Sequence, residues 1–209
     1  SGTSSKSTKL IHGGVRYLEK AILNLDREQY KMVIEALSER STLLKLAPHL
    51  AYELPIMLPV YNWYQLPYFF AGVKLYDLFA GKQAIQSSYI LSKRKTLEIF
   101  PHLKQDELKG AIVYYDGAHN DARMNVSVAL TAASEGAAIA NHVEVAGLIK
   151  EVDPATKTAK IIGARLRDTI SGESWDLRTT VVVNATGPFS DTIRKMDDPS
   201  IKSIVCPSS

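Results

Sequence analysis

Side chains that can do chemistry gather in the first eighteen residues, which read SGTSSKSTKLIHGGVRYL. Residues 1–8 are mostly small and hydroxylated, so they offer several hydrogen-bonding groups with little bulk. His12 follows, and the two glycines after it let the backbone come close to a ligand because glycine has no Cβ. Arg16 adds a guanidinium that can hold a phosphate through two parallel hydrogen bonds, with the phenol of Tyr17 beside it. A Ser/Gly-rich start is typical of a flexible linker, but a linker needs no such continuation, and the segment is therefore predicted to be a ligand-binding loop.

A second unusual stretch, residues 54–73, carries no formal charge. Its three prolines and the polar Asn62 and Gln65 argue against a membrane-spanning helix, because lipid cannot satisfy the backbone groups that prolines leave unpaired. The stretch also contains an aromatic cluster, which would suit a membrane interface or would fill a cavity between two domains. The cluster comprises Tyr61, Trp63, Tyr64, Tyr68, Phe69 and Phe70. The residues alone leave both interpretations open.

Composition narrows the class of protein. With 209 residues, of which 45% are hydrophobic, the chain can bury a sizeable core and form one large domain or parts of two. A formal net charge of +3 is too small to indicate nucleic-acid binding, and no nucleic-acid-binding motif occurs. Cys206 is the only cysteine, so neither an internal disulfide nor a cysteine-based metal site is expected, and no metal site is predicted.

The first long helix is predicted over residues 26–47. Asp26 is a suitable N-cap, apolar residues then recur at helical spacing, and Pro48 stops the run. The charged residues of this helix, Arg40 among them, are expected to be solvated. Short helical signals follow over residues 87–109, where Thr96 is a candidate cap and the basic run 93–95 is typical of a solvated surface.

Residues 110–115 are predicted to form a buried strand, followed by a turn at Asp116–Gly117. Asp121 is expected to cap the next helix, which Gly136 ends.

The chain then becomes rich in strand signals. Residues 140–149, 158–168 and 175–183 are separated by turn-like segments and predict a three-stranded antiparallel meander. Its end, the apolar run 181–183, is predicted to be a further strand that enters the small-residue turn 184–188. Such a turn lets backbone amides approach a dinucleotide, but taken alone it is more often an ordinary strand-to-helix connection.

Taken together, these motifs resemble the FAD-dependent glycerol-3-phosphate dehydrogenases, especially the mitochondrial form. The resemblance runs through essentially the whole chain. It rests on the N-terminal loop, LPIMLPVY at 54–61, GAIVYYDG at 110–117, HNDARMN at 119–125 and NATGPF at 184–189. No G-x-G-x-x-G fingerprint occurs, although the family carries one upstream of this loop. We therefore expect an internal fragment that lacks the N-terminal dinucleotide fingerprint and the C-terminal part of the enzyme.

The resemblance implies a mixed α/β (α+β) fold: part of a Rossmann-like FAD-binding domain with a three-stranded β-meander, plus part of a substrate or cap domain. It assigns residues 1–50 to the first part of the FAD-binding domain and residues 51–109 to a substrate, cap or membrane-contact excursion. Residues 110–192 would continue the FAD-binding domain, and 193–209 would begin a further segment.

The resemblance also implies an activity. FAD would accept a hydride from sn-glycerol 3-phosphate, giving dihydroxyacetone phosphate, and the electrons would pass to ubiquinone. The enzyme would lie peripherally on the mitochondrial inner membrane, and a homodimer is allowed. Two alternatives stay open: an oxygen-dependent glycerol-phosphate oxidase, and a noncatalytic membrane-surface or interaction module. The full enzyme is expected to be active, and the isolated fragment is expected to be inactive.

Site residues follow from the same resemblance. Arg16 and Tyr17 match the positions that contact the phosphorylated substrate. His12 is a candidate catalytic base, with a structural histidine bonded to the backbone as the alternative. Asp121 and Arg123 belong to a family motif without assignable roles. The positions matched to FAD binding are Thr3, Ser4, Ser5, Ser7, Thr8, Lys9, Leu10, Val145, Ala185, Thr186 and Gly187.

Overall fold

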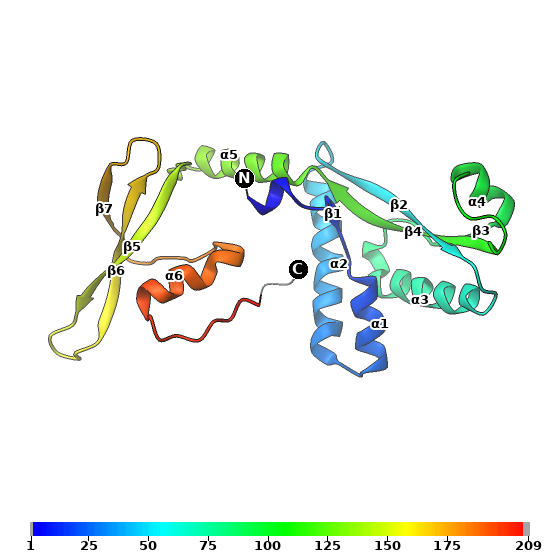
Figure 1. Ribbon diagram of the computed structural model, residues 1–209, viewed down its shortest axis with the longest axis horizontal. Coiled ribbons are helices and arrows are strands. Elements are labelled where there is room, and N and C mark those ends of the chain that lie inside the picture. Colours follow the sequence, from blue (N-terminus) through cyan, green and yellow to red (C-terminus); the bar gives the residue numbers. More distant parts are fainter. Residues whose placement is uncertain (1, 207–209) are drawn as a thin grey trace. The chain divides into compact units, whose positions relative to one another are not determined.

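The protein forms two compact units, Ser1–Glu135 and Gly136–Ser209 (Figure 1). The computed structural model describes residues 2–206, apart from the side chains of Arg16, Lys20 and Lys82. Each unit contains one antiparallel sheet together with helices, which confirms a mixed α/β class. The predicted division of the chain into the segments 1–50, 51–109, 110–192 and 193–209 remains a prediction.

Strand β4 (Gly110–His119) is the centre of the first sheet. Strand β2 (Ala51–Val60) pairs with its whole length, from Ala51 opposite His119 to Val60 opposite Gly110. On the other side, β1 (Leu10–Ile11) pairs with one end of β4 and β3 (Tyr89–Ser92) pairs with the other.

The turn predicted at Asp116–Gly117 is wrong, because both residues lie inside β4. Gly117 is needed there for close packing. A Cβ at this position would stand 3.1 Å from Ile11 Cβ and 3.2 Å from Arg40 Cγ. The glycine of this Asp-Gly pair therefore allows β1 and α2 to pack closely against β4, and the chain does not reverse direction there.

The uncharged stretch is divided between β2 and helix α3 (Gln65–Ala80). Among the described residues β2 pairs only with β4, so it is an edge strand. Pro55 and Pro59 are an even number of residues apart, so both lack an N–H on the same edge, and an edge strand tolerates this. Pro67 lies in the first turn of α3, where no intrahelical partner for its nitrogen is needed.

Three helices pack into one core in this unit. Helix α2 (Arg27–Leu46) begins as predicted, since the Asp26 carboxylate accepts hydrogen bonds from the N–H groups of Glu28 and Gln29. Helix α1 (Val15–Leu23), whose residues 15–18 were predicted to belong to a loop, lies against α2 (Figure 1). The shared core of α1, α2 and α3 comprises Leu18, Val33, Leu37, Tyr76 and Ala80.

Two predicted helix caps are wrong by a few residues. Helix α4 (Lys93–Ile99) is capped by Ser92, and Thr96 is instead buried inside the helix. Helix α5 (Asp121–Ser134) is capped by Asn120, whose side-chain oxygen accepts the Arg123 N–H. Asp121 is the first helical residue, where a carboxylate still meets the positive end of the helix dipole.

The aromatic cluster of the uncharged stretch is split between solvent and core. Trp63, Tyr64 and Tyr68 are exposed, whereas Phe69 and Phe70 pack against a buried cluster of β2, α3 and β4 residues. The cluster therefore contributes rings both to the surface and to the core of this unit. Within residues 2–206, no helix is both long and apolar enough to cross a membrane.

The second unit contains the predicted meander, formed by β5 (Val143–Val152), β6 (Ala159–Asp168) and β7 (Ser174–Arg178). The strand predicted at 181–183 is wrong, because these residues adopt no regular structure. A strand needs a partner for its backbone groups, and none of the strands in the described part of the chain pairs with this run. Three short 3-10 segments, Thr3–Ser5, Gly81–Gln83 and Gly187–Phe189, and helix α6 (Ser190–Asp197) complete the fold.

Candidate functional site

A buried ion pair lies beneath the N-terminal segment. Asp116 of β4 is fully buried, and Arg40 of α2 is 1% exposed. Arg40 Nη1 lies 2.8 Å from Asp116 Oδ1 and also donates to the Tyr76 hydroxyl at 3.0 Å. The expectation that Arg40 is solvated is therefore wrong. Helical periodicity explains why: residue 40 follows Val33 and Leu37 at i+7 and i+3, which places it on the buried face of α2.

Asp116 also anchors the His-Gly-Gly segment to the core. Its Oδ1 accepts the backbone N–H of Gly13 at 3.1 Å and that of Gly117 at 3.2 Å. Gly13 has no space for a side chain, since a Cβ there would stand 2.0 Å from the Tyr76 hydroxyl and 2.6 Å from Leu37 Cδ2. Gly13, the first glycine of the pair, therefore allows the loop backbone to pack closely against the protein's own core.

His12 extends from this anchored backbone. Its Nδ1 lies 3.0 Å from Asp116 Oδ2 and 2.8 Å from the backbone nitrogen of Gly14. The imidazole is 37% exposed, so one end of the ring meets buried polar groups while the ring remains reachable from solvent. This arrangement suits a proton acceptor held in one orientation.

Tyr76 completes the buried network as a neutral group. Burial, and next the negative charge of Asp116, raise the pKa of the Tyr76 phenol well above its ordinary value, while Arg40 acts in the opposite direction. The hydroxyl therefore stays protonated. One cation and one anion face each other inside the core, and their charges compensate.

The predicted FAD-binding residues fall into both units. Thr3–Ser5 form a 3-10 turn, residues 6–9 are irregular and Leu10 begins β1, and the side chains of this segment are exposed or half-buried. The carbonyl of Lys9 accepts the His119 N–H at 2.9 Å, which fastens this segment to β4. Val145 lies in β5, and the turn containing Ala185, Thr186 and Gly187 is exposed, so these belong to the second unit.

The predicted substrate-binding residues begin α1. Arg16 is helical, but its side chain lies outside the described residues. The side chain of Tyr17 is 50% exposed. The backbone N–H of Tyr17 bonds to the Gly14 carbonyl at 2.9 Å, so the helix starts directly after the anchored glycine pair. Gly14 itself has a φ of +82°, a backbone conformation that favours glycine.

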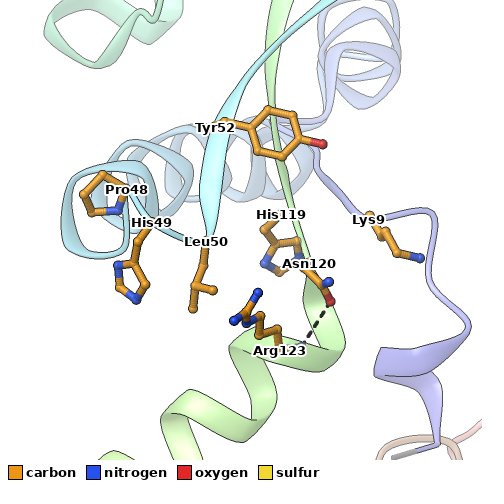
Figure 2. A pocket seen from close by; sticks show the side chains of 8 residues that line it. All are labelled: Lys9, Pro48, His49, Leu50, Tyr52, His119, Asn120 and Arg123. Atoms are coloured by element: carbon orange, nitrogen blue, oxygen red, sulfur yellow. Dashed lines mark hydrogen bonds between the residues drawn. The ribbon is translucent and has the colours of Figure 1, made fainter.

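A cavity of about 350 Å³ lies between Lys9, the start of β2, the end of β4 and the start of α5 (Figure 2). Four basic or imidazole side chains contribute to its wall, and none of the eight lining residues, all within the described part of the chain, is acidic. His119 Nδ1 is buried and finds no hydrogen-bond partner among the described residues. This lining suits an anionic group such as a phosphate or carboxylate. The lining residues are Lys9, Pro48, His49, Leu50, Tyr52, His119, Asn120 and Arg123.

Comparison with known proteins places the chain in a family. All of it, residues 1–209, matches the family described as FAD dependent oxidoreductase. The chain belongs to this family.

Among individual FAD dependent oxidoreductases, the chain is similar to glycerol-3-phosphate dehydrogenase, mitochondrial, of Bos taurus (62% identical) and of Homo sapiens (61% identical), each over 208 residues. All of this chain is covered in both alignments, but it spans only 29% of either relative. Among solved structures, it is similar to glycerol-3-phosphate dehydrogenase of Bacillus halodurans complexed with FAD, with a TM-score of 0.64 and 26% identity. That match covers 94% of this chain and 29% of the other. L-proline dehydrogenase of P. horikoshii, at a TM-score of 0.55, 19% identity and 79% coverage of this chain against 41% of the other, shares the fold.

The FAD dependent oxidoreductase assignment can be tested against the residues present. Residues 3–10 offer accessible hydroxyls, two lysines and backbone donors, and this donor set fits the phosphates and hydroxyls of a dinucleotide. The sequence did not predict the roles of Arg40, Asp116 and Tyr76, whose buried network holds His12 and Gly13 in place. One signal in the sequence could have indicated this network: Arg40 lies on the same helical face as the apolar residues Val33 and Leu37.

Proposed function

We propose that this chain forms part of a FAD-dependent dehydrogenase that oxidises sn-glycerol 3-phosphate to dihydroxyacetone phosphate. The observation that carries the proposal is the 62% identity to mitochondrial glycerol-3-phosphate dehydrogenase of Bos taurus over the entire chain. The anchored His-Gly-Gly segment supports it, because oxidation of an alcohol needs a proton acceptor for the hydroxyl proton.

The residues of this chain would divide the work as follows. FAD, when bound, supplies the acceptor for the hydride that leaves C2 of the substrate. The hydroxyl proton goes to the imidazole of His12, and the C–O single bond becomes the ketone. The guanidinium of Arg16 and the phenol of Tyr17 hold the substrate phosphate.

The cofactor would be held within a Rossmann-like FAD-binding domain to which the meander belongs. The hydroxyls and Lys9 of residues 3–10 would contact the polar part of FAD. Val145 and the turn Ala185–Thr186–Gly187 would contribute backbone groups. Residues 51–109 would belong to a substrate or cap domain, or to a membrane-contact excursion.

We further propose ubiquinone as electron acceptor and a peripheral position on the mitochondrial inner membrane, in keeping with the mitochondrial names of the relatives. The exposed aromatic rings of Trp63 and Tyr64 suit the membrane–water interface. Replacing both with serine in the full-length enzyme should weaken its binding to liposomes and leave reduction of a soluble dye nearly unchanged. Replacing the exposed Tyr89 and Ile90 with serine is the matched control. Equal liposome binding by both variants would contradict membrane contact through these rings.

Anaerobic titration of the FAD-loaded, full-length protein tests the activity itself. Addition of sn-glycerol 3-phosphate should bleach the flavin absorbance, and glycerol, which lacks the phosphate, should bleach it far more slowly. Arg16→Lys should reduce the difference in bleaching rate between sn-glycerol 3-phosphate and glycerol. The reason is that the ammonium of lysine is a point charge, whereas the guanidinium offers a planar fork of donors. Failure of the phosphorylated substrate to bleach the flavin would overturn the proposed function. Faster reoxidation by oxygen than by a ubiquinone analogue would favour the oxidase alternative.

A further inference from the structure

The Asp116 carboxylate uses its two oxygens differently. Oδ1 receives the guanidinium of Arg40 and the N–H groups of Gly13 and Gly117. Oδ2 is buried and accepts no hydrogen bond from the described residues as they stand, yet it lies 3.0 Å from Nδ1 of His12. An unpaired carboxylate oxygen inside a core is costly, so a proton between these two atoms would be strongly favoured.

A second group competes for the same nitrogen. The N–H of Gly14 points at His12 Nδ1 from 2.8 Å, and this contact is exposed. If Nδ1 carried no proton, it would accept the N–H of Gly14. Its lone pair would then also face the buried carboxylate of Asp116, and two acceptors repel each other. If Nδ1 carries the proton, it donates to Asp116, and the N–H of Gly14, a half-buried residue directly before α1, must turn away from Nδ1 and donate to water instead. A charge-assisted hydrogen bond is about twice as strong as a neutral one, so the bond to Asp116 prevails.

The charged and titratable groups around this contact are fixed. Asp116 approaches from β4, Arg40 from α2 and Tyr76 from α3, and all three are buried. Arg40 Nη1 bonds to the carboxylate, to the Tyr76 hydroxyl and to the Tyr115 carbonyl, so the carboxylate cannot rotate without breaking several contacts. The absence of a side chain at Gly13 lets this network sit directly under His12.

We propose that Asp116 is the positioning residue for His12. Its Oδ2 holds the proton on Nδ1, and Nε2 is left bare to take the hydroxyl proton of the substrate. The inference rests on the proposed function. It adds the residue that selects the reactive tautomer, and it gives a role to the buried Arg40–Asp116 pair that stability alone does not require.

The test is Asp116→Asn in the FAD-loaded, full-length enzyme. The asparagine amide can donate to Nδ1, so the proton of the neutral ring moves to Nε2, which then cannot act as a base. Flavin reduction by sn-glycerol 3-phosphate should slow by about 10²–10⁴-fold, the range of general-base catalysis, with FAD content retained. In Ser-His-Asp hydrolases the same replacement lowers kcat by about 10⁴-fold through the wrong tautomer.

A second measurement does not depend on turnover. Diethyl pyrocarbonate acylates a bare imidazole nitrogen, so His12 of the substrate-free enzyme should react, as followed by peptide mass spectrometry. In the Asp116→Asn variant, His12 should react several times more slowly. The matched control is Asp176→Asn, which removes a carboxylate from the exposed pair with Arg165 and should change neither measurement.

Misfolding is addressed by a double variant. Arg40→Met combined with Asp116→Asn removes both buried charges, so it should fold and bind FAD while flavin reduction stays slow. Rapid flavin reduction by either folded variant, or unchanged reactivity of His12, would overturn the role of Asp116. If the unmodified enzyme is not reduced by sn-glycerol 3-phosphate, the proposed function fails instead, and the reactivity of His12 still tests its tautomer.

Discussion

Replacing His12 with glutamine should slow reduction of the bound flavin by sn-glycerol 3-phosphate by about 10²–10⁴-fold, the contribution expected of a positioned general base. Glutamine keeps a polar side chain of similar length but cannot accept a proton at neutral pH. Because His12 follows the predicted FAD segment rather than belonging to it, FAD content should stay near normal. Stopped-flow absorbance of the flavin measures the rate directly.

The control for this variant is His102→Gln, which alters an exposed histidine beyond α4 and should leave the rate unchanged. A His12 variant that reacts within about threefold of the unmodified enzyme would mark His12 as a structural histidine, whose contacts with Gly14 and Asp116 serve only the shape of the loop. Loss of FAD together with activity would place His12 in cofactor binding.

Replacing Arg40 with methionine should lower the free energy of unfolding by about 3–5 kcal/mol, because Asp116 would remain buried without its cation. Methionine fills much of the space of the arginine stem, so the loss of charge dominates over the loss of packing. Urea unfolding followed by circular dichroism would measure the change. Adding Asp116→Asn should recover most of it, because the double variant has no unpaired buried charge.

Arg94→Met is the matched control for this stability effect. Arg94 lies in α4 and pairs with Glu98 at 3.4 Å, but its side chain is 84% exposed. Exposed pairs contribute about 0–1 kcal/mol, so this variant should unfold almost like the unmodified protein. Equal destabilisation by the two replacements would mean that the Arg40–Asp116 pair contributes no more than a surface contact.

The sequence predicted the elements whose signals are local. Helix α2 begins at its predicted cap because Asp26 bonds to its own next residues, and it ends just before Pro48. The meander was also predicted, since its turns separate the strands by a few residues. In both cases the interactions that define the element lie within a short stretch of chain.

Features that depend on distant contacts were not predicted. Asp-Gly at 116–117 has the composition of a turn, and only the approach of β1 and α2 shows why it lies within a strand. Arg40 and Asp116 are 76 residues apart in the sequence, so no local pattern around either residue predicts that they form a pair. The apolar run 181–183 has strand composition but lacks a partner strand among the described residues, and composition alone does not supply one.

The candidate site shows the same division. The His-Gly-Gly segment was recognised from its residue types, and its predicted ligand contacts remain proposals. The chemistry of His12 depends on a carboxylate 104 residues further along the chain, which becomes visible only once β4 is placed beneath the loop.

The most direct test of this account is a crystal structure of the FAD-loaded, full-length protein with dihydroxyacetone phosphate bound. We expect His12 Nε2 within about 3 Å of the ketone oxygen, which is the reach required for transfer of the hydroxyl proton. The same structure should show His12 Nδ1 against Asp116 Oδ2 and the substrate phosphate at Arg16. A ligand bound elsewhere, or an imidazole whose Nε2 is bonded to the backbone and turned from the ketone, would contradict the central claim.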